Sequence, residues 1–431
     1  MGGTMRLAID GGDPVRSDPF PNRALIGEEE KRAVLKIFDE VISKGTAIPY
    51  NGPGEAQYER NFASFMGGGF ADGVNSGTNA VFVALGALEL DALSEIIVPA
   101  INDPGGVMPV LFAGCVPVVA DSDPRTYNIS ADQIEPMITE RTRAIIVAHI
   151  GGEPADMGPI MELARSRKLH VIEDCAQCFG GMVGDSLAGT IGDISVFSTM
   201  FGKHYSTGGQ GGVVFTRDEA LYWRAKRFAD RGKAFHLPDR AGIGATTVNT
   251  DLWALSGNVV AGLNCNLNDL SAVIGSVQIK KLPQIIESRF RIGEAVKEAL
   301  KKHGAVSMGW QVPDTRSVYW FMRLKLDQDA IKVDKPTFCR ALAAEGLPVE
   351  PHYRKIPCEM PWFRNKAVFG KSGFPWDCSD YHGPRVPQCK IENAIKVTDE
   401  HFTILMHENY GTREIEDIVE AIEKVQKTYR R

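Results

Sequence analysis

A lysine lies between a short apolar run and a glycine-rich loop in the stretch FSTMFGKHYSTGGQGGVVFT, residues 197–216. Ser198 ends the apolar run, and Lys203 follows it five residues later. The flanking sequences are nearly free of charge, so we expect the Lys203 amine to be partly desolvated, with a lowered pKa. Such an amine can form a Schiff base with an aldehyde, whereas the ordinary alternative is a lysine exposed on the surface.

Two further groups of polar residues adjoin apolar runs that are typical of strands or helices. In NSGTNAVF, the amides around Gly77 and Thr78 begin a helix whose N-terminus favours a phosphate, although Ser-Gly-Thr is also a common helix cap. Asp174 ends the apolar run LHVIED, where its carboxylate either pairs with a cation such as a pyridinium nitrogen or caps the next helix. Ligands gather beyond the carboxyl ends of parallel strands, so these residues are candidates for one site.

The elements that must position these residues follow from the hydrophobic pattern. Short apolar runs alternate with helical patterns to about residue 260, which is typical of a mostly parallel sheet with helices on both faces. Residues 27–45 predict a helix before the first strand. We therefore predict an α/β fold with a large domain over residues 1–260 and a smaller C-terminal α+β domain over residues 261–431.

The smaller domain has its own pattern. Residues 282–304 predict a helix, residues 317–327 an alternating strand, and two further helical patterns follow. Residues 352–387 have little periodicity and several aromatic side chains, which indicates a lid, a binding loop or a surface excursion.

Composition excludes several classes of protein. The chain has 431 residues, is 44% hydrophobic and 24% charged, and carries a net charge of -6 without a Lys/Arg-rich run, so we expect neither nucleic acid nor membrane as a partner. The N-terminus has no apolar targeting segment, and the eight cysteines are scattered, which together favour a cytoplasmic protein with reduced thiols. Cys175 and Cys178 form a lone C-x-x-C pair that no second pair completes, so we expect two buried small residues and no metal site.

Taken in order, the sequence blocks resemble the sugar aminotransferase family named after DegT and StrS. This family belongs to the fold-type-I, aspartate-aminotransferase-like enzymes that use pyridoxal phosphate (PLP). Any one block is weak, but their order along almost the whole chain is specific. The matching blocks include GEEEKRAVLKIF, GPGEAQYERNFASFMG, NSGTNAVFVAL, AGCVPVVADSDPRTYNIS, VIEDCAQCFGG, FSTMFGKHYSTGGQGG and GLNCNLNDLSAVIGSVQIKKL.

The resemblance implies a role for individual residues. Lys203 would form the internal aldimine with PLP, Asp174 would pair with the pyridine nitrogen, and Gln177 would lie near the phenolic oxygen. The phosphate would be bound by Gly77, Thr78 and Ser198, and by Asn266 of the neighbouring subunit. Active sites shared in this way make a homodimer the minimum assembly. The segments that contact the acceptor in this family contain Arg231, His352, Tyr353 and His407, and His204 is a further candidate for substrate contact.

The implied reaction is transfer of an amino group from glutamate or glutamine to a keto sugar or a keto cyclitol. Asp174 would keep the ring nitrogen protonated, and Lys203 would move the Cα proton to the cofactor, which becomes pyridoxamine phosphate (PMP). The N-terminal AIDGGDPVR resembles the start of cyclitol-pathway relatives.

The sequence departs from the family pattern at two places. One extra residue separates the lysine from the glycine cluster, so alignment from Ser198 gives Lys203, whereas alignment from the cluster gives His204, the catalytic residue of PMP-dependent sugar dehydratases. We favour Lys203 because a glycine-rich loop absorbs an insertion readily. The family's usual aromatic residue beside the cofactor ring is replaced around Asn102, Asp103 and Pro104, while His149 is read as a structural imidazole.

Two alternatives to the aminotransferase therefore stay open. The first is a PMP-dependent sugar dehydratase with His204 as the catalytic base. The second is a regulatory paralogue that binds PLP without catalysis, although the presence of Asp174, Ser198 and Lys203 together argues against it.

Overall fold

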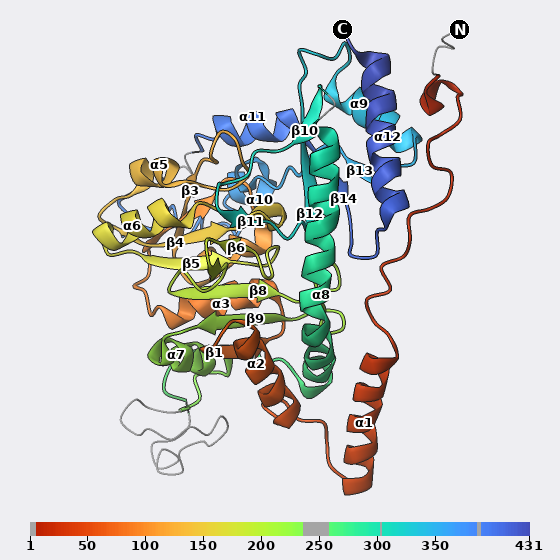
Figure 1. The fold of residues 1–431 in the computed structure, drawn as a ribbon. Helices are drawn as coiled ribbons and strands as arrows, with labels where there is room; N and C mark the ends of the chain where they lie inside the picture. The colour runs from red at the N-terminus through yellow and green to blue at the C-terminus, as the bar shows by residue number, and fades with distance from the viewer. Residues whose placement is uncertain (1–5, 236–257, 302–303, 386–388) are drawn as a thin grey trace.

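A seven-stranded sheet forms the centre of the larger part of the molecule (Figure 1). The computed structural model describes residues 6–235, 258–301, 304–385 and 389–431. The strand order is β1-β9-β8-β5-β4-β2-β3; β2, β3, β4, β5 and β8 run parallel, and β9 is antiparallel to both of its neighbours. The predicted mostly parallel α/β fold is confirmed. The strands are β1 (Phe70–Val74), β2 (Glu95–Pro99), β3 (Val116–Ala120), β4 (Thr142–Ala148), β5 (His170–Asp174), β8 (Ile194–Ser198) and β9 (Gly212–Thr216).

Helices cover both faces of this sheet because its strands are apolar on both sides. In β4, Ala144 and Ile146 join a core cluster with α3, whereas Ile145 and Val147 join a separate cluster with α6. The helices of this part are α2 (Pro53–Phe65), α3 (Gly77–Ala87), α4 (Met108–Phe112), α5 (Ala131–Ile134), α6 (Met157–Arg167) and α7 (Glu219–Ala229).

A long helix, α8 (Asp269–Leu300), runs from the large sheet to a second, antiparallel sheet of order β10-β12-β14-β13 (Figure 1). The prediction of a helix over 282–304 placed its start too late, because Pro283 reads as a break. The helix begins instead where the Asn268 side chain accepts a hydrogen bond from the Ser271 amide at 3.0 Å. Division of the chain after residue 260 stays a prediction.

The remaining elements complete the C-terminal part and its junction with the large sheet. The second sheet contains β10 (Val306–Met308), β12 (Phe321–Leu326), β13 (Val349–Glu350) and β14 (His401–Leu405), with α9 (Lys335–Ala344), α11 (Glu392–Glu400) and α12 (Thr412–Tyr429). A third small sheet joins β11 (Thr315–Arg316), β6 (Met182–Val183) and β7 (Ser186–Leu187). Short turns of helix are η1 (Ala8–Asp10), η2 (Pro104–Gly106), η3 (Glu135–Met137), η4 (Ile150–Gly152), η6 (Pro357–Glu359) and α10 (Pro361–Arg364).

The N-terminal segment does not pack where its position in the sequence suggests. It runs past α12 before entering α1 (Glu28–Lys44), and Leu7 is buried in the core of the C-terminal sheet (Figure 1). The predicted helix α1 is confirmed and ends at Gly45, whose φ is 62°. Its apolar stripe is largely open to solvent: Leu35, Phe38 and Ile42 are 50%, 41% and 75% exposed.

The described part of the segment that was predicted to be a lid, a binding loop or a surface excursion, residues 352–385, packs against the large sheet through several of its side chains. Cys358, Phe363 and Trp376 are buried in the same core cluster as β2 and α3. Cys358 also forms a disulfide with Cys389, so the expectation that all eight cysteines are reduced is wrong for this pair. The spacing of the two cysteines, 31 residues apart in an irregular segment, gave no sign of the pairing. The other six thiols are free, and those of Cys175 and Cys178 are buried as predicted.

Helices with the length and apolarity needed to cross a bilayer are absent from the described parts of the chain.

Candidate active site

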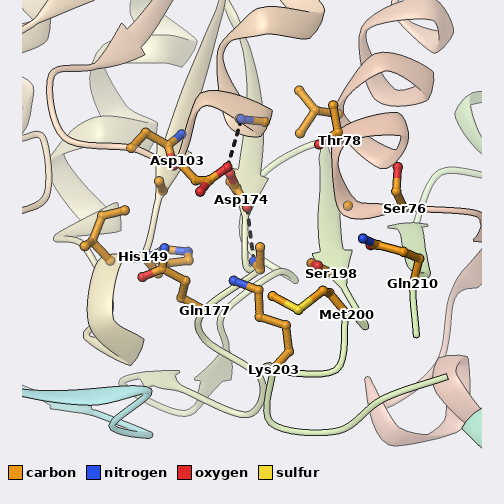
Figure 2. A pocket seen from close by; sticks show the side chains of 18 residues that line it. Ser76, Thr78, Asp103, His149, Asp174, Gln177, Ser198, Met200, Lys203 and Gln210 are labelled. Carbon is orange, nitrogen blue, oxygen red and sulfur yellow. Dashed lines mark hydrogen bonds between the residues drawn. The ribbon is translucent and has the colours of Figure 1, made fainter. Parts of the chain in front are cut away.

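One pocket lies beyond the carboxyl ends of β4, β5 and β8, beside the N-terminus of α3 (Figure 2). It brings together Gly77, Thr78, Asp174, Gln177, Ser198 and Lys203, six of the residues predicted from the sequence. Its other lining residues are Ser76, Val81, Asn102, Asp103, Gly105, Gly106, Ala148, His149, Ile150, Ala176, Met200 and Gln210. The parallel strands explain this gathering, because their carboxyl ends meet at one edge of the sheet.

Lys203 is a buried amine whose pKa is lowered because desolvation outweighs the attraction of nearby carboxylates. Its side chain enters the pocket from the β8–β9 loop (Figure 2), and the residue is 7% exposed. Burial lowers the Lys203 pKa to about 8, against the opposing attraction of Asp174 and Asp103. The Nζ atom lies 4.0 Å from the centroid of the Trp320 ring. A large share of Lys203 is therefore the neutral, nucleophilic amine at mildly alkaline pH.

Asp174 is a buried carboxylate at the end of β5. Burial raises its pKa, and the Ala176 amide, which donates to Oδ1 at 3.1 Å, works with Lys203 and the Asn102 amide in the opposite direction. A cation placed against this carboxylate offsets the desolvation that burial imposes. The site is therefore suited to a buried, protonated ring nitrogen.

Two glycines of the pocket, Gly77 and Gly105, lie so close to the side chains of Ser198 and Thr78 that neither position has room for a Cβ atom. A Cβ at Gly77 would lie 2.6 Å from the Ser198 Cβ, and one at Gly105 would lie 2.4 Å from the Thr78 Oγ1. Ser76 caps α3, accepting from the Asn79 amide at 3.1 Å, so the first free amides of the helix face the pocket mouth. This cradle, with the Ser198 hydroxyl, has the donors that a phosphate needs.

Gln177 and Tyr353 form a hydrogen-bonded pair in the wall. The Gly151 amide donates to Gln177 Oε1 at 2.8 Å, and Gln177 Nε2 donates to the Tyr353 hydroxyl at 2.7 Å. The Tyr353 ring packs against Phe321, with centroids 5.1 Å apart. Tyr353 thus supports the pocket through Gln177 and is not itself among the lining residues.

His149 lines the pocket with both ring nitrogens already engaged. The Ala155 amide donates to Nδ1 at 3.0 Å, so Nε2 carries the proton and donates to Glu173 Oε2 at 3.1 Å. Glu173 in turn accepts from the amides of Gly189, Ile191 and Gly192. The imidazole is fully buried, and its hydrogen bonds hold the surrounding chain in place. His149 nevertheless lies among the residues that line the cavity.

The other predicted residues lie outside this pocket. His204 turns its ring away, with Nε2 3.1 Å from the Val318 carbonyl, and burial places its pKa well below the usual range. Arg231 contacts Tyr50 at 2.8 Å, His407 contacts the Pro21 carbonyl at 2.7 Å, and burial beside Lys335 and Arg354 lowers the His352 pKa. The Asn266 Nδ2 reaches Asn51 at 3.4 Å, while its buried Oδ1 finds no hydrogen-bond partner among the residues that the structure describes.

Several pocket residues gave little indication in the sequence. Met200, Gln210 and Gly106 line the cavity, and Trp320, which immediately precedes β12 of the second sheet, contacts Lys203. Asp103 occupies the place where an aromatic side chain was expected, accepts a hydrogen bond from the Gly105 amide at 2.9 Å, and partly offsets the lowering of the Lys203 pKa by burial. Only the departure at Asp103 was visible in advance.

The donor set fits PLP. The carboxylate suits the ring nitrogen, the α3 cradle suits the phosphate, and the lysine amine suits the aldehyde. The fold and this pocket define a PLP-dependent enzyme of the aminotransferase type. The chain belongs to the DegT/DnrJ/EryC1/StrS aminotransferase family, whose profile matches residues 26–376.

Individual relatives agree with this family. The chain is 33% identical over 308 residues to GDP-perosamine synthase of Escherichia coli O157:H7, covering 71% of this chain and 77% of that protein. It is 27% identical over 435 residues to the L-glutamine:2-deoxy-scyllo-inosose aminotransferase of Streptoalloteichus tenebrarius, covering 98% and 97%. An aminotransferase structure from Psychrobacter cryohalolentis superposes with a TM-score of 0.78 at 26% identity, covering 94% and 98% of the two chains.

Proposed function

We propose that this aminotransferase moves an amino group from glutamate or glutamine to a keto sugar or a keto cyclitol. The observation that carries the proposal is the buried Lys203 amine in one pocket with Asp174 and the α3 cradle. The named activities of the similar GDP-perosamine synthase and inosose aminotransferase support this substrate class.

The roles of the residues follow from their positions. When bound, PLP supplies an aldehyde that takes the amino group and a ring that accepts electrons from the donor's Cα. Asp174 holds the ring nitrogen in its protonated form, and Gly77, Thr78 and Ser198 bind the phosphate. Lys203 would hold the aldehyde between turnovers, and its Nζ, once freed by the amino donor, would take the proton from Cα and deliver it to the cofactor carbon that carried the aldehyde. Gln177, fixed by Gly151 and Tyr353, orients the ring through its phenolic oxygen.

The orientations of Lys203 and His204 support the lysine as the catalytic residue. Lys203 lines the pocket, whereas the His204 ring is buried against the Val318 carbonyl. No contact of the described residues favours the dehydratase, so we retain a single candidate reaction.

A homodimer with shared active sites is part of the proposal. The exposed apolar stripe of α1 and the exposed Leu263, at 57%, are surfaces that a second copy can bury. Among the described residues, the Asn266 side-chain oxygen has no hydrogen-bond partner, and Asn266 does not line the pocket of its own subunit, as we expect of a residue that serves the partner's site. The proposal also places the protein in the cytoplasm; six free thiols support this placement, whereas the Cys358–Cys389 disulfide is unusual for that compartment.

The test is transfer of label from amino-¹⁵N glutamate or glutamine. Purified protein loaded with PLP is incubated with either 2-deoxy-scyllo-inosose or a GDP-linked 4-keto-6-deoxy sugar, and products are analysed by mass spectrometry. The proposal predicts a ¹⁵N-labelled amine from one acceptor, with one equivalent of the donor's keto acid. Release of a dehydrated sugar that carries no ¹⁵N would contradict it.

A further inference from the structure

The loop that carries Lys203 is held by side chains from distant parts of the chain. Three of its consecutive carbonyl groups accept hydrogen bonds from outside the loop. Trp320 Nε1 donates to the Gly202 carbonyl at 2.9 Å, Arg23 Nη1 to that of Lys203 at 2.5 Å, and Arg23 Nη2 to that of His204 at 2.6 Å. The two terminal nitrogens of the Arg23 guanidinium therefore bind the carbonyl groups of Lys203 and His204. These are the two residues that the alternative sequence alignments place at the catalytic position.

Arg23 is itself fixed in position. Its Nε donates to Glu408 Oε1 at 2.8 Å, and the other oxygen of Glu408 accepts from Arg289 Nε at 2.9 Å. Arg289 is 2% exposed and also donates to the carbonyl groups of Tyr319 and Met406. Glu408 thus ties Arg23 to the C-terminal sheet through a buried arginine, and such ionised hydrogen bonds are among the stronger ones in proteins.

The N-terminal segment delivers Arg23 to this place. His407 Nε2 contacts the Pro21 carbonyl at 2.7 Å, and Asn409 Nδ2 donates to the Arg23 carbonyl at 2.6 Å. Farther along, Arg16 pairs with Asp417 of α12 at 2.6 Å. Figure 1 shows this segment running along the C-terminal helices before it enters α1. The segment is therefore an anchored strap, residues 16–23, that ends at the Lys203 loop.

The side chains of the two bridged residues diverge. Lys203 enters the pocket, and His204 turns to the Val318 carbonyl. The loop from Thr199 to Gly211 also contains the extra residue and the glycines that make it easy to shift along its length. A slip by one position would exchange the lysine and the histidine in the pocket, and a planar fork bound to both carbonyl groups opposes such a slip.

We propose that Arg23 is a positioning residue that clamps the carbonyl groups of Lys203 and His204 and thereby keeps the lysine, and not the histidine, in the pocket. This rests on the proposed function in taking Lys203 as the residue that bonds PLP. Arg23→Lys keeps the positive charge beside Glu408 but lacks the planar guanidinium, so it should hold the two carbonyl groups less firmly.

The test compares Arg23→Met and Arg23→Lys with Arg413→Met. Arg413 is a matched control because it pairs with Asp18 of the same strap at 3.0 Å but lies on the surface, 65% exposed. The first readout uses apo-protein: pulse labelling of amines with acetic anhydride across pH, with the Lys203 peptide followed by mass spectrometry. The second is the kcat of transamination, and the melting temperature of each apo-protein reports on folding.

For the wild type and Arg413→Met we expect a labelling midpoint for Lys203 at about 8. In Arg23→Met the amine gains solvent, so the midpoint should rise by about one pH unit or more toward the ordinary lysine value. The kcat should fall by about tenfold to a hundredfold, as expected for a misplaced catalytic group. Arg23→Lys should recover the melting temperature but not the midpoint or the kcat.

Two outcomes overturn the inference: an Arg23→Met that matches Arg413→Met in midpoint and kcat, or full recovery of both by Arg23→Lys. If Arg23→Met does not fold, Arg23→Lys alone decides between the fork and a merely structural charge. Failure of the proposed function gives a different result, because borohydride would then trap no PLP adduct on Lys203 in the wild type. The two failures are therefore distinguishable.

Discussion

The Lys203 amine and the Asp174 carboxylate lie in one buried pocket, and each opposes the pKa shift that burial imposes on the other. Burial lowers the lysine pKa to about 8 and raises that of the aspartate. A cofactor that bonds the amine and presents a cationic nitrogen to the carboxylate relieves both penalties at once. Burial of the two groups therefore destabilises the folded apo-protein, and we expect PLP to remove that destabilisation.

That cost predicts a stability change on replacing the lysine. The Lys203 pKa falls from 10.5 to about 8, and a shift of this size corresponds to about 3 kcal/mol. Because the unfolded lysine binds its proton more tightly, the penalty is complete below pH 8 and disappears as pH rises toward 10.5. We expect Lys203→Met to stabilise the apo-protein by up to about 3 kcal/mol at pH 7, and by less than half of that at pH 9.5.

Urea denaturation of the two apo-proteins at both pH values measures this difference. His204→Gln is a suitable control, since a neighbouring buried side chain changes while the Lys203 amine stays. An equal difference at pH 7 and pH 9.5 would show that titration of Lys203 is not its source.

The cradle at α3 predicts a selective loss of cofactor affinity in Gly77→Ala. The added methyl group would lie 2.6 Å from the Ser198 Cβ, and overpacking of this kind costs about 1–3 kcal/mol. Moving the N-terminus of α3 away from β8 relieves the contact and weakens the phosphate site, so we expect a PLP dissociation constant about tenfold higher. Equilibrium dialysis of the apo-protein measures it.

Gly209→Ala is the matched control for this substitution. Gly209 lies in the neighbouring loop, and an added Cβ would meet nothing within 4 Å. Comparable PLP affinity in Gly77→Ala and Gly209→Ala would contradict the assignment of the phosphate site to the N-terminus of α3.

Shared active sites predict complementation between two inactive variants. In the proposed dimer each active site combines Lys203 of one subunit with Asn266 of the other. Lys203→Ala therefore inactivates the site of its own subunit, and Asn266→Leu inactivates the site of the partner subunit. A mixed dimer then has one doubly altered and one intact site, so random exchange of subunits should recover about a quarter of the wild-type activity. Activity after mixing, unfolding and refolding the two variants together measures it.

Each variant refolded alone is the control for the complementation experiment. Sites contained within single subunits give no activity above the sum of these controls. A monomer in sedimentation experiments at assay concentration would contradict the dimer directly.

The disulfide predicts a stability that depends on redox conditions. The Cys358–Cys389 bond links two residues that are 31 positions apart. A cross-link that closes a loop of this length stabilises the folded protein by about 3–4 kcal/mol, because it restricts the unfolded chain. We expect Ellman titration in denaturant without reductant to find six of the eight thiols, and dithiothreitol to lower the melting temperature. Eight reactive thiols in freshly purified protein would show that the bond does not form.

Periodicity predicted the parallel strands and α1, because each buried strand is a continuous apolar run and Gly45 ends the helix. It did not indicate β1, since Asp72 interrupts that strand. In the structure Asp72 accepts a hydrogen bond from the buried Lys226 at 2.6 Å, a contact across 154 residues that no local pattern contains. The same reason hid the Cys358–Cys389 bond.

For the site, the motifs near strand ends identified six of the residues that line the pocket, because the chemistry of each was visible from its type and flank. The supports of the site were not visible. Arg23 reaches the Lys203 carbonyl across 180 residues, and Trp320 comes from the residues just before β12. Such contacts depend on how the strap and the C-terminal sheet dock, which tertiary packing alone decides.

Borohydride reduction of the PLP-loaded protein, followed by peptide mass mapping, tests the central assignment most directly. The account predicts a single phosphopyridoxyl adduct on Lys203, absent from Lys203→Ala and retained in His204→Gln. Tight binding of PLP without an adduct on Lys203, or an adduct on a different lysine, would contradict it.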